Sequence, residues 1–329
     1  MKVKVGLMLG GGGAKGGYQL GVIRALQEAN LIDKIDCIAG TSIGAINALL
    51  LMSLNDSNKM SEIWNLAQAK NPIKQKLFRI NQDKEGLYSL EVLREIFDKY
   101  IDIKKVKNSK IDTFVVASKI IDTKKIASQI RTGNHEKTVF HINKMENPFD
   151  AVIASASIPL FFGTTYIDDQ AYVDGGLVDN NPLDILIEQG CNVILSVPLD
   201  HGFNYNAYAN HKILFINLTD FNVFSALPLI DAYDIIRFTD ESIEERRNYG
   251  YLVATEIVQK LRETNILKRG VLGLNENFVK VDKFTYIEAP KETYERVKTL
   301  RKERRISNKE AQKRLSIKEK IEQALSRGK

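Results

Sequence analysis

The chain has 329 residues, of which 44% are hydrophobic and 27% charged, so it can bury the core of one large α/β domain or of two smaller ones. No segment reaches the roughly 20 apolar residues of a membrane-spanning helix, and the short apolar run after Met1 does not have the form of a signal peptide. Two cysteines, Cys37 and Cys191, lie in apolar runs and argue against a disulfide framework, so we expect a cytoplasmic protein with two buried thiols.

The net charge of +6 is concentrated near the C-terminus. Residues 291–329 contain 14 Lys and Arg against 6 Asp and Glu, a net +8, which leaves −2 for the other 290 residues. Few aromatic residues accompany these charges, so the pattern argues against a nucleic-acid-binding protein. We expect a basic helical tail, either solvated or in peripheral contact with an anionic membrane.

Two strand–turn–helix units open the chain. Residues 3–9 alternate and then become fully apolar, which predicts a buried parallel strand. A glycine-rich turn follows at 10–17, and apolar residues at helical spacing then predict a helix at 18–28. The second unit repeats this plan with a strand at 35–39, a turn, and a helix from residue 45.

The rest of the chain alternates predicted strands and helices. Residues 55–110 are more polar and helical in pieces, so they form a candidate cap or lid. Further strands are expected at 113–120, 124–130, 192–199 and 212–218, the first two as a hairpin, and helices at 148–162, 181–190 and 240–263. This alternation predicts an α/β fold with a layered sheet.

Six glycines within positions 10–17 are compatible with several kinds of turn. A phosphate loop of the Walker type is excluded because Lys15 is followed by Gly16 and not by Ser or Thr. A dinucleotide fingerprint fits Gly11, Gly13 and Gly16, which would make the protein a nucleotide-binding oxidoreductase. Asp33 and Asp36 come before the apolar run 38–39, however, whereas a ribose-binding acid should close the second strand, which ends in GTSIG instead.

An oxyanion hole is the third interpretation of the glycine turn, and a simple hinge is the fourth. Glycines let backbone N–H groups turn toward a developing negative charge, and the helix that follows adds the positive end of its dipole. The segment "AGTSIGA" favours this interpretation, because Gly40, Ser42 and Gly44 make a GxSxG turn between a strand and a helix. In parallel neighbouring strands both turns would open at the same edge of the sheet.

A nucleophilic serine needs a base. The four histidines lie in polar surroundings without a distinguishing motif. The alternative is Asp174 in "YVDGGLVDNNPLD", where Gly175 and Gly176 allow a close backbone approach and partial burial would raise the proton affinity of the carboxylate. The competing interpretation of this segment is an ordinary Asp-Gly turn.

Four motifs in order, "GGGGAKG", "GTSIG", "ASASIPLFF" and "DGGLVDNNP", resemble the patatin-like phospholipases, lipid acyl hydrolases also related to cytosolic phospholipase A2. The resemblance covers roughly residues 3–220. It implies a three-layer α/β/α sandwich with a mainly parallel sheet and a patatin-like catalytic core at 1–220. Residues 221–289 would then complete the same domain, and 290–329 would form the tail.

The resemblance also implies roles for individual residues. Ser42 matches the nucleophile and Asp174 the group that activates it, without a histidine, a metal or a cofactor. The oxyanion loop corresponds to Gly11, Gly12 and Gly13, and we add the amide of Ile43 as a further donor. Motif support comes from Lys15, Gly16, Gly40, Gly44, Gly175 and Gly176. The expected substrate is a lipid or phospholipid ester.

Overall fold

The computed structural model describes residues 3–69, 90–122, 133–159, 162–201, 203–220, 223–224, 227, 231, 234–267 and 283–303. Residues 1–289 form one compact unit and residues 290–329 a second one. In the second unit, residues 291–303 are helical. In the part of the chain that is described, no helix has both the length and the apolar character needed to cross a membrane.

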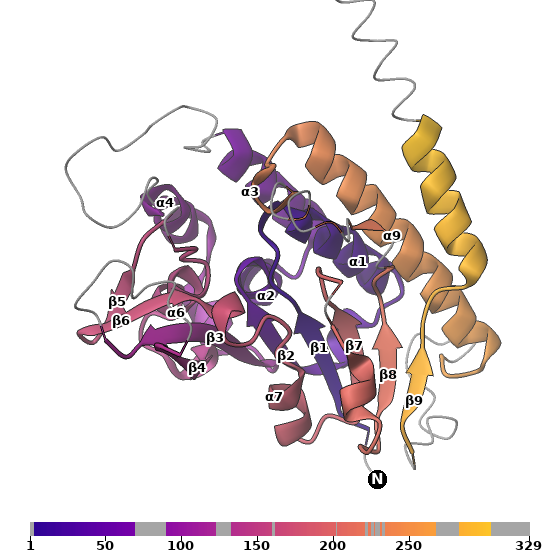
Figure 1. The fold of residues 1–329 in the computed structure, drawn as a ribbon, viewed down its shortest axis with the longest axis horizontal. Helices are drawn as coiled ribbons and strands as arrows, with labels where there is room; N and C mark the ends of the chain where they lie inside the picture. Colours follow the sequence, from indigo (N-terminus) through magenta and orange to yellow (C-terminus); the bar gives the residue numbers. More distant parts are fainter. Residues whose placement is uncertain are drawn as a thin grey trace, which may run out of the picture. The chain divides into compact units, whose positions relative to one another are not determined.

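A mainly parallel sheet forms the centre of residues 1–289. Its described strands lie in the order β5–β6–β3–β2–β1–β7–β8–β9, and β4 also pairs with β3 (Figure 1). The parallel strands are β1 (Val5–Leu9), β2 (Ile35–Thr41), β3 (Asp112–Ile120), β7 (Val193–Val197), β8 (Leu214–Asn217) and β9 (Thr285–Ile287). The antiparallel pairs involve β4 (His135–His141), β5 (Thr165–Ile167) and β6 (Gln170–Asp174). Strands β1, β7 and β8 are buried throughout, as their continuous apolar sequences predict.

Helices cover both faces of this sheet. They are α1 (Gly17–Glu28), α2 (Ile43–Leu54), α3 (Ser57–Ala69), α4 (Glu91–Tyr100), α5 (Ile103–Lys107), α6 (Pro148–Ser155), α7 (Leu183–Glu188) and α9 (Asp240–Glu263). On one face, α7 packs on Met8, Ala39 and Val116. On the other face, α2 lies on β2 and α6 on β3, and α1, α3 and α9 complete the layer (Figure 1). The predicted three-layer α/β/α sandwich is therefore confirmed.

Helices α1 and α9 lie side by side and make an unusually close contact (Figure 1). A Cβ atom on Gly21 would overlap the carbonyl oxygen of Arg247, and one on Gly250 would overlap the carbonyl oxygen of Tyr18. The two backbones can approach this closely only because both positions lack a side chain. Helix α1 begins directly after the glycine-rich turn. Its contact with α9 therefore fixes the position of the C-terminal end of the turn.

Several elements differ from the sequence expectation. The strand expected at 124–130 falls outside the described residues, and the antiparallel partner of β3 is β4 at 135–141. The helix expected at 148–162 ends at Ser155, consistent with Pro159 disfavouring helical backbone just before it. Both cysteines are buried free thiols, as expected.

Candidate active site

Ser42 lies at a strained turn between β2 and α2. Its backbone angles are φ 54° and ψ −121°, a combination that L-residues rarely adopt outside such sites. Gly44 gives the turn room, because a Cβ there would overlap the carbonyl of Leu9. The Ser42 N–H donates to Ser155 Oγ at 2.8 Å, and Ser155 Oγ donates to the Val116 carbonyl at 2.5 Å. Helix α6 and strand β3 thus hold the turn that presents the Ser42 hydroxyl.

Asp174 closes strand β6 beside this turn. Ser42 Oγ donates a hydrogen bond of 2.5 Å to Asp174 Oδ2, across 132 residues of sequence. The N–H of Gly176 donates to Asp174 Oδ1 at 2.8 Å, which fixes the orientation of the carboxylate. Burial raises the pKa of the Asp174 carboxyl to about 6, against the opposing effect of these two hydrogen bonds. The pair is therefore a buried hydroxyl next to a carboxylate of increased basicity.

The glycine-rich turn lies next to Ser42. A Cβ on Gly11 would lie 3.3 Å from Ser42 Cβ, so the absence of a side chain at this position brings the two segments together. The N–H of Gly11 donates to the Asn180 carbonyl at 3.0 Å, so this amide, one of the expected oxyanion donors, already has an acceptor in the structure. Within the described residues, the N–H groups of Gly12, Gly13 and Ile43 have no acceptor. These three amides are available for an anionic oxygen.

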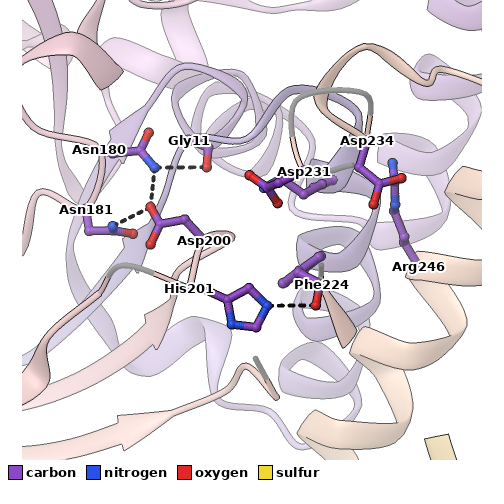
Figure 2. Close-up of polar contacts among 10 residues, drawn as sticks. Gly11, Asn180, Asn181, Asp200, His201, Phe224, Asp231, Asp234 and Arg246 are labelled. Atoms are coloured by element: carbon purple, nitrogen blue, oxygen red, sulfur yellow. Dashed lines mark hydrogen bonds and ion pairs between the residues drawn. The ribbon is translucent and has the colours of Figure 1, made fainter. Parts of the chain in front are cut away.

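A cluster of polar side chains lies beside the turn and is bonded to it (Figure 2). Asn180 Nδ2 donates to Asp200 Oδ2 at 2.5 Å and makes a long contact of 3.4 Å to the Gly11 carbonyl. Asn181 Nδ2 donates to the same Asp200 oxygen at 2.9 Å. Because Asn180 binds Gly11 through its backbone carbonyl as well, it fixes the turn at two atoms.

Lys15 is buried inside the turn, with 1% of its surface exposed. Its Nζ pairs with Asp231 Oδ1 at 2.8 Å and lies 5.4 Å from the centre of the Phe224 ring. Asp234 in turn pairs with Arg246 of α9 at 2.8 Å (Figure 2). The lysine charge is therefore already compensated, and the segment that compensates it is tied to α9.

Two cavities meet at Ser42. The first has a volume of about 150 Å³ and is lined mainly by apolar side chains, which come from α2, α3, α4 and the segments around 156–162 and 235–238. The second, of about 230 Å³, is lined by the glycine-rich turn and by both charged and apolar residues, the charged ones being Lys15, Asp174, Asp200 and Asp231. Both include Ser42, so the hydroxyl lies where an apolar cavity joins one that contains charged side chains.

The model of one protein family, described as patatin-like phospholipase, matches residues 7–187, which is more than half of the chain. The chain belongs to this family. The matched segment contains Ser42, Asp174 and the glycine-rich turn.

Comparison with individual proteins gives more distant similarities. Lysophospholipase NTE1 of Kluyveromyces lactis is 24% identical over 270 residues, which cover 79% of this chain and 16% of that protein. A cGAMP-activated phospholipase of Escherichia coli is 26% identical over 191 residues, which cover 54% of this chain and 52% of the relative. This patatin-like chain thus spans a small part of the first relative and about half of the second. Among solved structures, VipD from Legionella pneumophila aligns with 87% of this chain and 61% of its own, at 16% identity and a TM-score of 0.36.

The histidines of this family member lie away from the serine. His135 bonds Ser118 Oγ at 2.9 Å, His141 pairs with Asp112 at 3.1 Å, and His201 contacts the Phe224 carbonyl at 2.7 Å. None of the four histidines, all of which lie in the described part, lines either cavity at Ser42. Over the same part of the chain, no group of three or more His, Cys, Asp or Glu side chains is arranged to hold a metal ion.

Sequence reasoning missed the residues that position the pair. Ser155 and Asn180 lie inside the motifs "ASASIPLFF" and "DGGLVDNNP", but their bonds to Ser42 and Gly11 were not anticipated. The available signal was a serine at the end of the mostly apolar helix 148–155 and an asparagine in a patatin motif. Neither signal names a partner, because each bond joins segments more than a hundred residues apart.

Proposed function

We propose that this patatin-like protein hydrolyses carboxylic esters of lipids, with phospholipids or lysophospholipids as the substrate class. The observation that carries the proposal is the 2.5 Å hydrogen bond between Ser42 Oγ and Asp174 Oδ2 beside three backbone amides that have no acceptor among the described residues. Membership of the patatin-like family supports the same substrate class.

Asp174 acts as the general base in the proposed mechanism. It takes the proton of Ser42 as Oγ forms a bond to the ester carbonyl carbon. The tetrahedral intermediate collapses, the proton passes to the leaving alcohol, and an acyl-enzyme remains on Ser42. Water then attacks the acyl-enzyme with Asp174 again as base, which releases the fatty acid and restores the hydroxyl.

The oxyanion of each intermediate would be held by the amides of Gly12, Gly13 and Ile43. Ile43 is the first residue of α2, so the positive end of that helix dipole adds to the donor set. Donors fixed in advance stabilise the developing charge without reorganisation, which is the largest contribution in many acyl-transfer enzymes. Gly11 contributes by its lack of a side chain rather than by its amide.

The two cavities suggest how a lipid ester would bind. Ile46, Leu50 and Phe97 are among the apolar side chains that would take the acyl chain. The second cavity, which contains Asp200 and Asp231, would take the alcohol side of the ester. The basic segment 291–329 would supply peripheral contact with an anionic membrane, and no nucleic acid is involved.

The proposal is tested by replacing each member of the pair. We expect Ser42→Ala and Asp174→Asn each to lower esterase activity by at least ~10³-fold, about 4 kcal/mol of activation free energy. Rates are measured with p-nitrophenyl esters and with lysophosphatidylcholine. Ser61→Ala, at a serine of α3 whose hydroxyl donates to the Ser57 carbonyl of the same helix, is the matched control and should retain wild-type rates.

Active-site labelling separates the proposal from its alternative. A fluorophosphonate should label the wild type and Ser61→Ala but not Ser42→Ala. Full activity in Ser42→Ala would disprove the nucleophile assignment. Binding of a nicotinamide dinucleotide without any labelling would instead support the oxidoreductase that Gly11, Gly13 and Gly16 also fit on sequence alone.

A further inference from the structure

A chain of buried polar side chains connects the apolar cavity to the glycine-rich turn. Trp64 Nε1 donates to Asn47 Oδ1 at 2.8 Å, Asn47 Nδ2 donates to Gln19 Oε1 at 2.8 Å, and Gln19 Nε2 donates to the Gly10 carbonyl at 2.8 Å. Asn47 and Gln19 are completely buried, and Trp64 is 5% exposed. Burying polar groups of this kind costs free energy unless every one of them is hydrogen-bonded, so close packing alone does not explain this network.

The direction of these hydrogen bonds is fixed at both ends. An indole N–H can only donate and a backbone carbonyl can only accept, so the two amide side chains between them have a single consistent orientation. Asn47 Nδ2 also reaches the Gly16 carbonyl at 3.2 Å. The network therefore binds Gly10 and Gly16, the residues on either side of the proposed oxyanion donors.

Trp64 belongs to both the network and the cavity. Its ring lines the apolar cavity together with Ile43, whose amide is one of the proposed donors. The ring also packs on the turn itself, since a Cβ on Gly16 would lie 3.1 Å from its Cη2 atom. A group that enters the apolar cavity thus contacts a side chain that is bonded, through two amides, to the backbone next to Gly11–Gly13.

We propose that Trp64, Asn47 and Gln19 are positioning residues that hold the glycine-rich turn in its oxyanion-binding shape, and that an acyl chain filling the apolar cavity seats Trp64 and thereby the turn. This inference rests on the proposed esterase function. Binding energy from the acyl chain is then used in the chemical step, so a longer chain raises kcat and not only the affinity. Substrates without an acyl chain of sufficient length would react slowly even at saturation.

The experiment compares p-nitrophenyl acetate with p-nitrophenyl octanoate in variants that break the network at its two ends. Trp64→Phe keeps an aromatic cavity wall but loses the N–H donor, and Gln19→Met keeps the side-chain length but loses the bond to Gly10. Each should lower kcat for the octanoate about tenfold, the effect of one neutral hydrogen bond, and should leave kcat for the acetate within about twofold. KM for the octanoate should change little.

Gln27→Met is the matched control, because Gln27 lies on the same helix as Gln19 but bonds Asn55 and Ser57 and lines neither cavity. It should leave kcat and KM for both esters near those of the wild type. Unchanged kcat for the octanoate in both network variants, or a loss confined to KM, would overturn the positioning role. An equal loss of kcat on both esters would overturn the coupling to the acyl chain. Thermal unfolding identifies a variant that fails to fold. The test then rests on the variant at the other end of the network.

Labelling distinguishes a failure of this inference from a failure of the proposed function. An octyl fluorophosphonate forms a covalent phosphonate ester with a nucleophilic serine, with loss of fluoride, and places its phosphoryl oxygen at the same amides. If the wild type is not labelled, the proposed function is wrong. If the wild type is labelled and both network variants react at its rate, the network does not position the turn.

Discussion

At Asp174, one physical cause connects catalysis with stability. The carboxyl is 7% exposed and surrounded by protein, so its charged form has lost most of its hydration. Its pKa of about 6 makes it a better proton acceptor than an ordinary aspartate while it is still ionised at neutral pH. The same loss of hydration is a cost to the folded state whenever the carboxylate is charged.

The pH dependence of the reaction should report this pKa. General-base catalysis requires ionised Asp174, so we expect kcat/KM to rise with pH through about 6 and to level off above it. Chromatographic measurement of the released fatty acid checks this, because it does not depend on the ionisation of the product or of a chromophore. A limb centred near the ordinary value of an exposed aspartate would contradict the assignment of Asp174 as the base.

Asp174→Asn should stabilise the protein at neutral pH although it removes activity. The folded-state pKa is raised, so between pH 4 and pH 6 the native state binds more protons than the unfolded state, and wild-type stability falls as pH rises through this window. The neutral asparagine avoids this loss, which amounts to about 3 kcal/mol above pH 7. Urea unfolding at pH 4.5 and pH 7.5 measures it.

The informative quantity is the difference between the variant and the wild type at the two pH values. Asp98→Asn, at an exposed position of α4, should show no such dependence. If Asp174→Asn raised the free energy of unfolding equally at both pH values, burial of the charged carboxylate would not be the cause of the stabilisation.

Among the elements, the contact between α1 and α9 is one that a single methyl group should break. We expect Gly250→Ala to lower the free energy of unfolding by about 2–3 kcal/mol, because its Cβ must displace the backbone of Tyr18. Alanine is the better helix former, so any intrinsic effect has the opposite sign. Asn248→Ala, at an exposed position of the same helix, should change stability by no more than about 0.5 kcal/mol. Equal denaturation midpoints for the two variants would show that the helices tolerate a wider spacing.

Strands buried on both faces could be predicted from the sequence, and half-exposed ones could not. The continuous apolar runs of β1, β7 and β8 have few alternatives to a position inside a parallel sheet. Strand β4 reads "HEKTVFH" and is nowhere fully buried, so its sequence resembles a loop until it pairs with β3. Strand β6 is only five residues long, and its position comes from a partner more than fifty residues earlier.

In the candidate site, too, some features could be predicted from the sequence and others could not. The meeting of Ser42 with Asp174 followed from motifs that keep their order and separation, and the 2.5 Å bond agrees with it. The use of the Gly11 amide by Asn180 could not be foreseen, since a glycine motif specifies backbone freedom and not the direction of each N–H. Long-range contacts decide which donors remain available.

For the molecule as a whole, the uneven charge is the feature with a functional consequence. A net +8 lies in residues 291–329, while the other 290 residues carry −2. A lipid hydrolase meets its substrate at a membrane surface, and clustered Lys and Arg gain about 1 kcal/mol each near an anionic leaflet. The other 290 residues, with their net negative charge, would by themselves be repelled by such a surface.

We therefore expect the tail to control binding to anionic vesicles. In the full chain, replacing Lys313, Arg314, Lys318 and Lys320 by Gln should reduce partitioning onto phosphatidylcholine vesicles containing phosphatidylglycerol by at least ~10-fold, since four favourable charges are lost at constant chain length. Binding to pure phosphatidylcholine vesicles should be unaffected, and added salt should remove the difference. A chain ending at Ala289 should bind no more strongly than the variant, and its hydrolysis of soluble p-nitrophenyl esters should equal that of the full protein, because Ser42 and Asp174 both belong to the unit 1–289. Equal vesicle binding by all three proteins would exclude the tail from membrane contact and leave it a solvated basic segment.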